Sequence, residues 1–219
     1  MDNIYLACTH THTGPEVNLN RKILPEKQEA YFPFFCSRLV DAARFALQDL
    51  KPAKMGWGVG NAPGIAFVRR FRMKDGSCRT NPGVGNPDID HPLGNADEEA
   101  SLLILKREGA KEILLVHFGN HADMIGGKLY TPDWPGYLVN ILDTVLEDKV
   151  NTMFLLGAQG DLNHRNFYNP LLTYKGVENA KCAARMVAAA VLRIYDRAKP
   201  SDSNCLRYAH TYVQVGKNL

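Results

Sequence analysis

The residues of this sequence that could carry chemistry begin with two histidines near the N-terminus. His10 and His12 follow a short apolar run, and Gly14-Pro15 breaks the pattern just after them. Residues i and i+2 of an extended chain point to the same face, so we expect both imidazoles to aim at one point beyond the end of a buried strand. Two converging imidazoles can bind a transition metal, or one can hold a metal while the other moves a proton. The alternative, which a lone His-x-His leaves open, is a surface strand end with two solvated histidines.

Polar residues also come directly after two later apolar runs, residues 112–118 and 152–156. If these runs are neighbouring strands with the same direction, their polar ends meet the two histidines at one edge of a sheet. Sites in open α/β sheets gather at the carboxyl ends of the strands. The polar residues are Asn120, His121 and Asp123 after the first run, and Asp161, Asn163 and His164 after the second.

Zinc commonly takes histidine nitrogen and carboxylate oxygen ligands, and a catalytic zinc keeps one position open for water. Bound water then has a pKa near ~7 and becomes a nucleophile. On chemistry alone, His10, His12 and His121 are ligand candidates, and Asp161 is either a fourth ligand or a residue that orients one. A plain turn is the alternative for the segment that contains Asp161. The pair Arg69-Arg70, near a strand end, fits either a solvated edge or a clamp for an anion or a carbonyl.

The hydrophobic pattern predicts an α/β protein, a layered sandwich with a mixed β-sheet flanked by helices. Residues 112–118 are almost wholly apolar, which predicts a central strand buried on both faces. Residues 77–97 are rich in Gly, Pro, Asn and Asp, which predicts a long ordered loop that covers the site. We expect helices over residues 25–50 (with a break at Pro33 left open), 133–146 and 177–197, and strands over 3–10, 55–60, 65–71, 102–106, 112–118, 152–156 and 206–215.

Composition excludes several classes of protein. The net charge is only +3 and no basic stripe stands out, so we expect no nucleic-acid partner. No apolar run approaches the ~20 residues that span a bilayer, and no signal peptide follows Met1, so the compartment is left undetermined. The five cysteines form no CxxC pair, which argues against a cysteine zinc site and fits a reduced compartment.

Taken together, these residues resemble the neutral/alkaline, non-lysosomal ceramidase family. They occur in the family's order with similar gaps, and the resemblance covers nearly the whole chain. The motifs that carry it are Thr9-His10-Thr11-His12-Thr13-Gly14-Pro15, Arg69-Arg70, Asn86-Pro87-Asp88-Ile89, Asn120-His121, Asp133-Trp134-Pro135-Gly136-Tyr137 and Gly157-Ala158-Gln159-Gly160-Asp161-Leu162-Asn163.

The resemblance implies a zinc amidohydrolase that cleaves the N-acyl bond of ceramide into fatty acid and sphingosine. By this resemblance His10 and His121 are the zinc ligands, and His12 is a neighbour that contacts the reacting group. Arg70 is the arginine that polarises or positions the substrate amide. The implied reaction is attack of zinc-activated water on the amide carbonyl, with zinc and Arg70 stabilising the developing oxyanion. The expected catalytic residues are His12, Arg70, Asp161 and Asn163.

The sequence departs from the family in two respects. The family completes its zinc site with a Glu and a Tyr from a downstream segment, so we expect residues 1–219 to form a single ceramidase-like α/β domain that is incomplete at both ends. Asn163 stands where characterised ceramidases carry a serine implicated in catalysis, which affects the choice of substrate most.

We therefore expect a small-molecule or lipid amide substrate and transient contact with a membrane surface. Whether the chain forms a homo-oligomer is left open. Family members are often secreted. One alternative is a catalytically incomplete domain of the same fold that acts as a binding or interaction module. Another is a metal hydrolase that acts on a different ester or amide.

Overall fold

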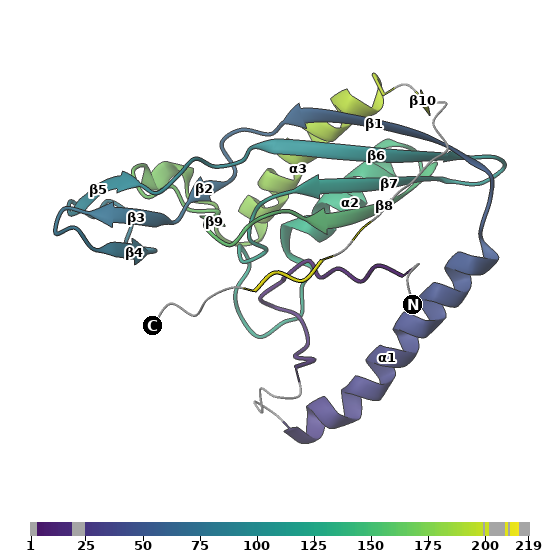
Figure 1. The fold of residues 1–219 in the computed structure, drawn as a ribbon, viewed down its shortest axis with the longest axis horizontal. Coiled ribbons are helices and arrows are strands. Elements are labelled where there is room, and N and C mark those ends of the chain that lie inside the picture. The colour runs from purple at the N-terminus through teal and green to yellow at the C-terminus, as the bar shows by residue number, and fades with distance from the viewer. Residues whose placement is uncertain (1–3, 19–24, 199, 202–208, 210, 215–219) are drawn as a thin grey trace.

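The computed structural model describes residues 4–18, 25–198, 200–201, 209 and 211–214, and every structural statement below concerns these residues. Its centre is a five-stranded sheet with the strand order β10-β1-β6-β7-β8 (Figure 1). Strands β7 and β8 are parallel and the other neighbours are antiparallel, so the sheet is mixed. The predicted α/β class is confirmed. The strands are β10 (Pro200–Ser201), β1 (Ala53–Asn61), β6 (Glu99–Arg107), β7 (Glu112–Phe118) and β8 (Val150–Leu156).

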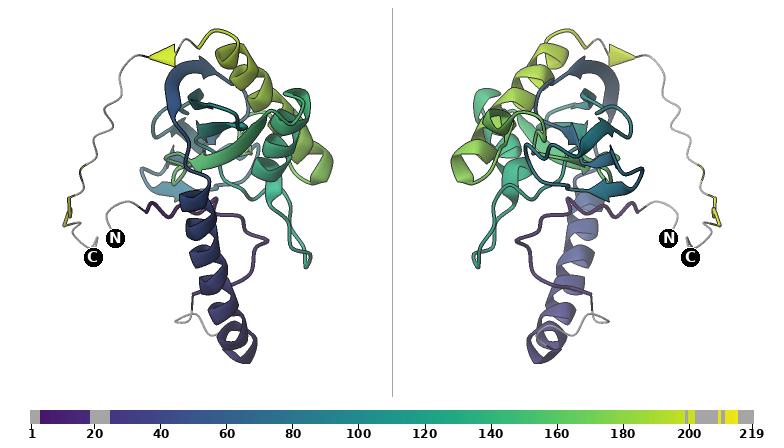
Figure 2. Two further views of the ribbon diagram at one scale, coloured as in Figure 1. Left: turned by 90° about the vertical axis from the view of Figure 1, so that its right-hand side faces the viewer. Right: turned by 90° about the vertical axis from the view of Figure 1, so that its left-hand side faces the viewer.

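Two helices, α2 (Asp133–Val145) and α3 (Val177–Tyr195), cover one face of this sheet (Figures 1 and 2). The core lies between the helices and the sheet, and Ile104, Leu114 and Val116 are fully buried there. Alanines on α3 and glycines on β1 allow a close approach, because a Cβ atom on Gly60 would lie 3.2 Å from the side chain of Ile194. Small residues on both elements thus determine how tightly α3 packs on the sheet.

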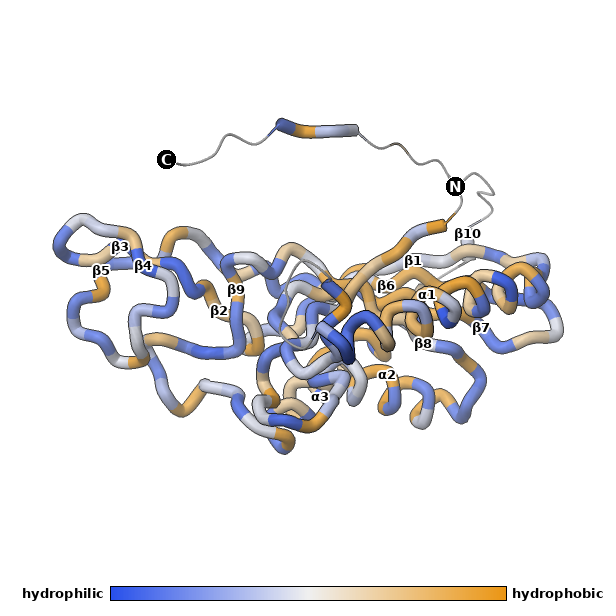
Figure 3. The backbone as a smooth tube through the Cα atoms, turned by 90° about the horizontal axis from the view of Figure 1, so that it is seen from below, coloured by the Kyte–Doolittle hydropathy of each residue, from blue (hydrophilic) through white to orange (hydrophobic). Residues whose placement is uncertain are grey.

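The opposite face of the sheet is more open, and here the expectation of a strand buried on both faces is wrong. Val116 and Phe118 of β7 are fully buried, but His117 between them is exposed. Trp57 on β1 is 65% exposed and Met153 on β8 is 52% exposed. Neither α2 nor α3 covers this face, so strand β7 follows the alternation of a sheet with one packed face. Figure 3 shows the apolar residues concentrated along the central strands.

Helix α1 (Pro25–Gln48) stands apart from the sheet (Figures 1 and 2). It is one continuous helix, and Pro33 lies inside it without splitting it in two. Of its residues, Gln28 alone is buried. The predicted helix over residues 25–50 is therefore confirmed, but it does not contribute to the core described above.

A second group of short strands lies beyond the carboxyl ends of β7 and β8. The expected strand over residues 65–71 is instead two strands, β2 (Phe67–Val68) and β3 (Arg70–Met73), which belong to different sheets. The expected long loop over residues 77–97 is also wrong in part, because β4 and β5 flank β3 there. These strands form because Phe71 and Met73 pack in a small core with Ile89 and Phe167. The remaining bounds are β4 (Cys78–Thr80), β5 (Ile89–Pro92), β9 (Leu162–Asn163), which pairs with β2, and the 3-10 helix η1 (Pro170–Leu172).

The two ends of the chain differ from expectation. Residues 4–18 form no helix or strand, and Ile4 and Tyr5 are 60% and 86% exposed, so the buried N-terminal strand is not present. Half of the expected strand over residues 206–215 lies outside the described residues, and its described part, 209 and 211–214, is not a strand. Within the described part of the chain, no helix combines the length and apolar character needed to cross a membrane.

Candidate metal centre

Threonines, and not a strand, hold the N-terminal histidines in place. The hydroxyl of Thr11 donates to the backbone oxygen of Thr131 at 2.9 Å. The hydroxyls of Thr13 and Thr131 lie 2.8 Å apart, and the Thr131 N–H donates to the Thr13 carbonyl at 3.1 Å. In addition, the backbone N–H of His12 donates to the carbonyl of Ala122 at 3.0 Å. Residues 11–13 are thus hydrogen-bonded to Ala122 and Thr131, which follow His121 in the chain. The alternation of Thr with His in the sequence is the signal from which this attachment could have been predicted.

His121 lies three residues after the end of β7 and is 4% exposed. Its backbone oxygen accepts a hydrogen bond from the indole N–H of Trp134 at 3.0 Å. Its ring Nδ1 lies 2.8 Å from the carbonyl oxygen of Leu162, to which it donates. This bond fixes the tautomer and leaves Nε2 as the lone-pair nitrogen, which is the usual arrangement for a histidine that binds a metal.

The loop after His121 is fixed by Asp133, which is fully buried. Its carboxylate accepts hydrogen bonds from the backbone N–H groups of Trp134 at 2.7 Å and Ile125 at 2.8 Å. Burial raises the pKa of Asp133, and these two bonds oppose that shift. Asp133 therefore acts here as a support for the backbone around His121.

His10, His12 and His121 converge in space. Each offers a ring nitrogen, and these nitrogens lie within 4.8 Å of one another. The Nε2 atoms of His10 and His12 are 3.2 Å apart, and the ring centroids of His10 and His121 are 5.1 Å apart. His10 has a φ of 57°, in the left-handed region that side chains other than glycine rarely adopt, at a cost of about 1–3 kcal/mol. The sequence predicted this convergence from i, i+2 spacing on a strand, whereas a turn at His10 produces it.

The electrostatics of the site favour neutral imidazoles at His10 and His121. Burial first, and then the charge of Arg69, lowers the pKa of His121 below its ordinary value of 6.5. Burial also lowers the pKa of His10, with further contributions from His12 and Arg69. His12 Nδ1 lies 3.4 Å from a carboxylate oxygen of Asp123. A neutral imidazole has a free lone pair, so His10 and His121 are competent ligands at neutral pH.

The two adjacent arginines occupy different surroundings. The guanidinium of Arg69 donates to the carbonyl oxygen of Gly160 through Nε at 3.0 Å and Nη2 at 2.7 Å, and its charge acts on His10 and His121. Arg70 begins β3, is exposed, and pairs through its backbone with Thr80. The structure therefore brings Arg69, the neighbour of the residue predicted from the family resemblance, close to the histidines.

Asp161 lies in the turn after β8 and Asn163 ends the short strand β9, and their contacts are with the protein backbone and with amides. Asp161 is exposed, and its backbone oxygen accepts from the Arg69 N–H at 2.8 Å. Asn163 is buried and donates through Nδ2 to Asn81 at 3.2 Å, while its Oδ1 accepts from the Arg165 N–H at 2.6 Å. Among the described residues, Asp161 does not join the group of His, Cys, Asp and Glu side chains whose ligand atoms could surround one ion. This segment contributes to the cluster through the carbonyl oxygen of Leu162, which accepts the hydrogen bond from His121.

A metal ion would fit this donor set. Zinc–nitrogen bonds of 2.0–2.1 Å in tetrahedral geometry place ligand nitrogens about 3.4 Å apart. The ring nitrogens of His10, His12 and His121 lie within 4.8 Å of one another, so those of two ligands reach that separation with only small side-chain movements. The oriented Nδ1–H of His121 is the second feature that suits a metal. The cluster can therefore hold a metal ion.

Comparison with known proteins identifies the fold. Neither the family models nor the curated proteins provide a match. Among solved structures, a neutral ceramidase from Pseudomonas aeruginosa aligns with a TM-score of 0.63 at 18% identity, over 87% of this chain and 31% of that chain. A ceramidase complexed with C2 aligns with a TM-score of 0.65 at 18% identity, over 88% of this chain and 30% of that chain. This chain thus has the fold of part of a ceramidase and spans less than a third of the length of those two chains.

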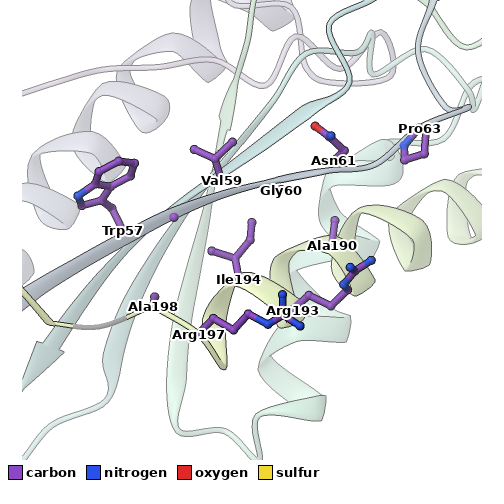
Figure 4. Close-up of a pocket in the computed structure, with 11 residues that line it drawn as sticks. Trp57, Val59, Gly60, Asn61, Pro63, Ala190, Arg193, Ile194, Arg197 and Ala198 are labelled. Atoms are coloured by element: carbon purple, nitrogen blue, oxygen red, sulfur yellow. The ribbon is translucent and has the colours of Figure 1, made fainter.

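A groove of about 540 Å³ lies elsewhere, between β1 and the end of α3 (Figure 4). Trp57, Arg193 and Arg197 are among its lining residues, together with glycines of β1. It contains none of the residues predicted to form the site. The histidine cluster, and not this groove, is the candidate functional site.

Proposed function

We propose that this chain is a zinc-dependent hydrolase of the ceramidase fold that cleaves the N-acyl amide bond of a lipid. One observation carries the proposal: His10, His12 and His121 come from segments more than a hundred residues apart and converge within 4.8 Å. They do so beside the end of β7, in a fold shared with two ceramidases. A lipid amide is the substrate class that those two proteins suggest.

His10 and His121 are the proposed metal ligands. Both have lowered pKa values, so they are neutral at pH 7 and present lone pairs without first losing a proton. His121 is also held in the required tautomer by Leu162. A zinc ion bound there would act as a Lewis acid on the amide carbonyl and would lower the pKa of a bound water.

His12 and Arg69 are the proposed residues that act on the substrate. The Asp123 carboxylate beside Nδ1 of His12 favours a proton on that nitrogen and leaves Nε2 to accept one from the reacting group. Arg69 is anchored on the Gly160 carbonyl, and it brings a fixed positive charge to the histidines. Such a charge would stabilise the negative oxygen that develops during amide hydrolysis, the role that the family resemblance gave to Arg70.

A purely binding role for this domain is less well supported. A fold that needs only to pack gains nothing from three imidazoles that face one another, with His10 in an unfavourable backbone conformation. Strain of this kind gathers at functional sites. We therefore favour the hydrolase over a catalytically incomplete interaction module.

Zinc binding is the first test. Purified protein is titrated with zinc against a competing chelator, and H121A is compared with H91A, because His91 has a side chain that is 58% exposed and lies outside the cluster. We expect H121A to weaken zinc binding by about a thousandfold or more, beyond the 10–100-fold loss typical of a residue that only supports a ligand. H91A should bind zinc like the unmodified protein. Equal binding by H121A and the unmodified protein would contradict the proposal.

Hydrolysis is the second test. Short-chain ceramide and a series of N-acyl amino alcohols are offered to the zinc-loaded protein, and release of the fatty acid is measured. We expect turnover that a chelator abolishes and added zinc restores. Turnover of simple esters with none of amides would support the alternative of a different metal hydrolase.

A further inference from the structure

The groove between β1 and the end of α3 lies along an open edge of the central sheet (Figure 4). On its inner side, β1 pairs with β6 over its whole length, from Ala53 to Asn61. On its outer side, β10 pairs only with Met55 and Gly56. Residues 57–61 therefore have no strand partner on that side among the residues that the structure describes. An edge of this kind presents backbone N–H and C=O groups to which a further strand can bind.

The two faces of β1 differ in chemistry along this edge. Side chains of a strand alternate between its faces, and Figure 4 shows Trp57 and Val59 on the face of β1 away from α3. These two side chains are 65% and 48% exposed. Gly58 and Gly60 face α3, because a Cβ atom on either would lie 3.2 Å or less from the side chain of Ile194. A strand added to this edge would thus place alternate side chains beside an apolar pair on one face and beside α3 on the other.

The α3 side of the groove is positively charged. Arg193 and Arg197 line it, both are exposed, and neither guanidinium makes a hydrogen bond or an ion pair with any described residue. No aspartate or glutamate is among the lining residues. Arg197 follows the last residue of α3 by two and continues its turn, because its backbone N–H donates to the Ile194 carbonyl at 3.0 Å. The two arginines are therefore separated by one helical turn, about 5.4 Å along the axis.

We propose that this edge binds an extended acidic segment of a partner protein, which pairs with residues 57–61 of β1 as an additional strand. Two acidic residues separated by one residue are about 6.6 Å apart in a strand, close to the spacing of Arg193 and Arg197. The residue between them would face the other way, beside Trp57 and Val59, so the segment alternates acidic with apolar residues. Backbone hydrogen bonds supply affinity in this mode of recognition, and alternate side chains supply specificity. The groove contains none of the clustered histidines, so the proposal does not depend on hydrolysis.

A synthetic peptide with the alternating pattern tests the charge on this surface. Fluorescein-labelled Gly-Asp-Val-Asp-Val-Asp-Gly is titrated with the full chain at low salt, and binding is measured by fluorescence anisotropy. We expect R193Q/R197Q to weaken binding by about tenfold, the combined effect of two exposed ion pairs. R185Q is the matched control and should bind like the unmodified protein, because Arg185 is exposed on the same helix but does not line the groove. Equal binding by R193Q/R197Q and the unmodified protein, or no binding by the latter at millimolar concentration, would overturn the proposal.

Amide hydrogen exchange tests the strand pairing. With the peptide at ten times its Kd, the outward-facing amides of residues 57–61 should exchange about tenfold more slowly, because exchange then proceeds mainly from the small fraction of free protein. Peptide binding that leaves these amides unprotected would contradict the added strand. Sedimentation with phosphatidylserine vesicles covers the other source of negative charge. Sedimentation that requires Arg193 and Arg197, with no binding of the peptide, would assign this surface to a membrane and overturn the proposal.

Discussion

His121 of the histidine cluster and the turn of residues 161–164, which includes the two-residue strand β9, follow two adjacent parallel strands, yet the cluster and the turn are built in opposite ways. In the cluster, the rings of His10 and His12 are exposed and face each other and His121. In the turn, Asn163 and His164 are buried, and the Asn163 amide is occupied by protein partners. Similar polar residues at equivalent strand ends have thus separated into a group that can meet a ligand and a group that supports it. The carbonyl of Leu162 is the direct link between the two.

Arg69 is the residue through which this comparison can be tested most strongly. It is anchored in the turn by Gly160, but its charge acts on the cluster. If it supplies charge to a developing oxyanion, R69Q should lower kcat on an N-acyl amide by about 10²–10³-fold. R69Q should also raise the pKa of His121 and of His10, because a positive neighbour has been removed.

R70Q is the matched control for this change. Arg70 is the adjacent residue of the same type, but it is exposed on β3. We expect R70Q to leave kcat and the histidine pKa values measured by NMR close to those of the unmodified protein. A large loss of activity in R70Q with none in R69Q would reverse the assignment and restore the role that the family resemblance gave to Arg70.

The supporting character of the turn predicts a pH dependence of stability. The pKa of His164 is about 4 in the folded protein and near 6.5 in the unfolded chain, so between these values the unfolded chain binds more protons. The free energy of unfolding should therefore rise as the pH rises from 4 to 6.5, by about 3 kcal/mol at most from this residue. Urea unfolding at pH 4.5 and 7 measures the change, and in H164L the rise should be smaller by a comparable amount. An equal rise in both proteins would show that His164 is not the source.

The smallest expected effects are on the free energy of unfolding, and they distinguish Asn163 from Asp161, the two predicted catalytic residues of the turn. N163A leaves the Arg165 N–H and Asn81 without their partners and should reduce the free energy of unfolding by about 1–3 kcal/mol. N163S keeps an acceptor oxygen and should lose less. D161N changes an exposed side chain and should stay within about 0.5 kcal/mol. Chemical denaturation measures all three, and a zinc affinity that falls sharply in D161N would place Asp161 in the metal site after all.

Much of the fold follows from local pattern, because apolar periodicity and turn residues act over short distances. β6, β7, β8, α2 and α3 lie where the sequence predicts them. The failures occur where distant packing decides. β7 has an open face because neither α2 nor α3 covers it, and β3 to β5 form a small sheet because Phe71 and Met73 find partners in Ile89 and Phe167. The composition of residues 77–97 carries no information about Phe71, Met73 and Phe167, which pack against Ile89.

The sequence by itself determined the chemical types available for the site. His10, His12 and His121, with glycines and polar residues after apolar runs, were sufficient to predict that three segments converge. Only the tertiary structure decided how they converge: Thr11 and Thr13 bind Thr131, His10 adopts a left-handed turn, and Leu162 orients His121. It also brings the charge of Arg69 to bear on His10 and His121, which is the basis for proposing Arg69 in the role that the resemblance gave to Arg70. Residue identity is local, but the distance between two ring nitrogens is set by every segment packed between them.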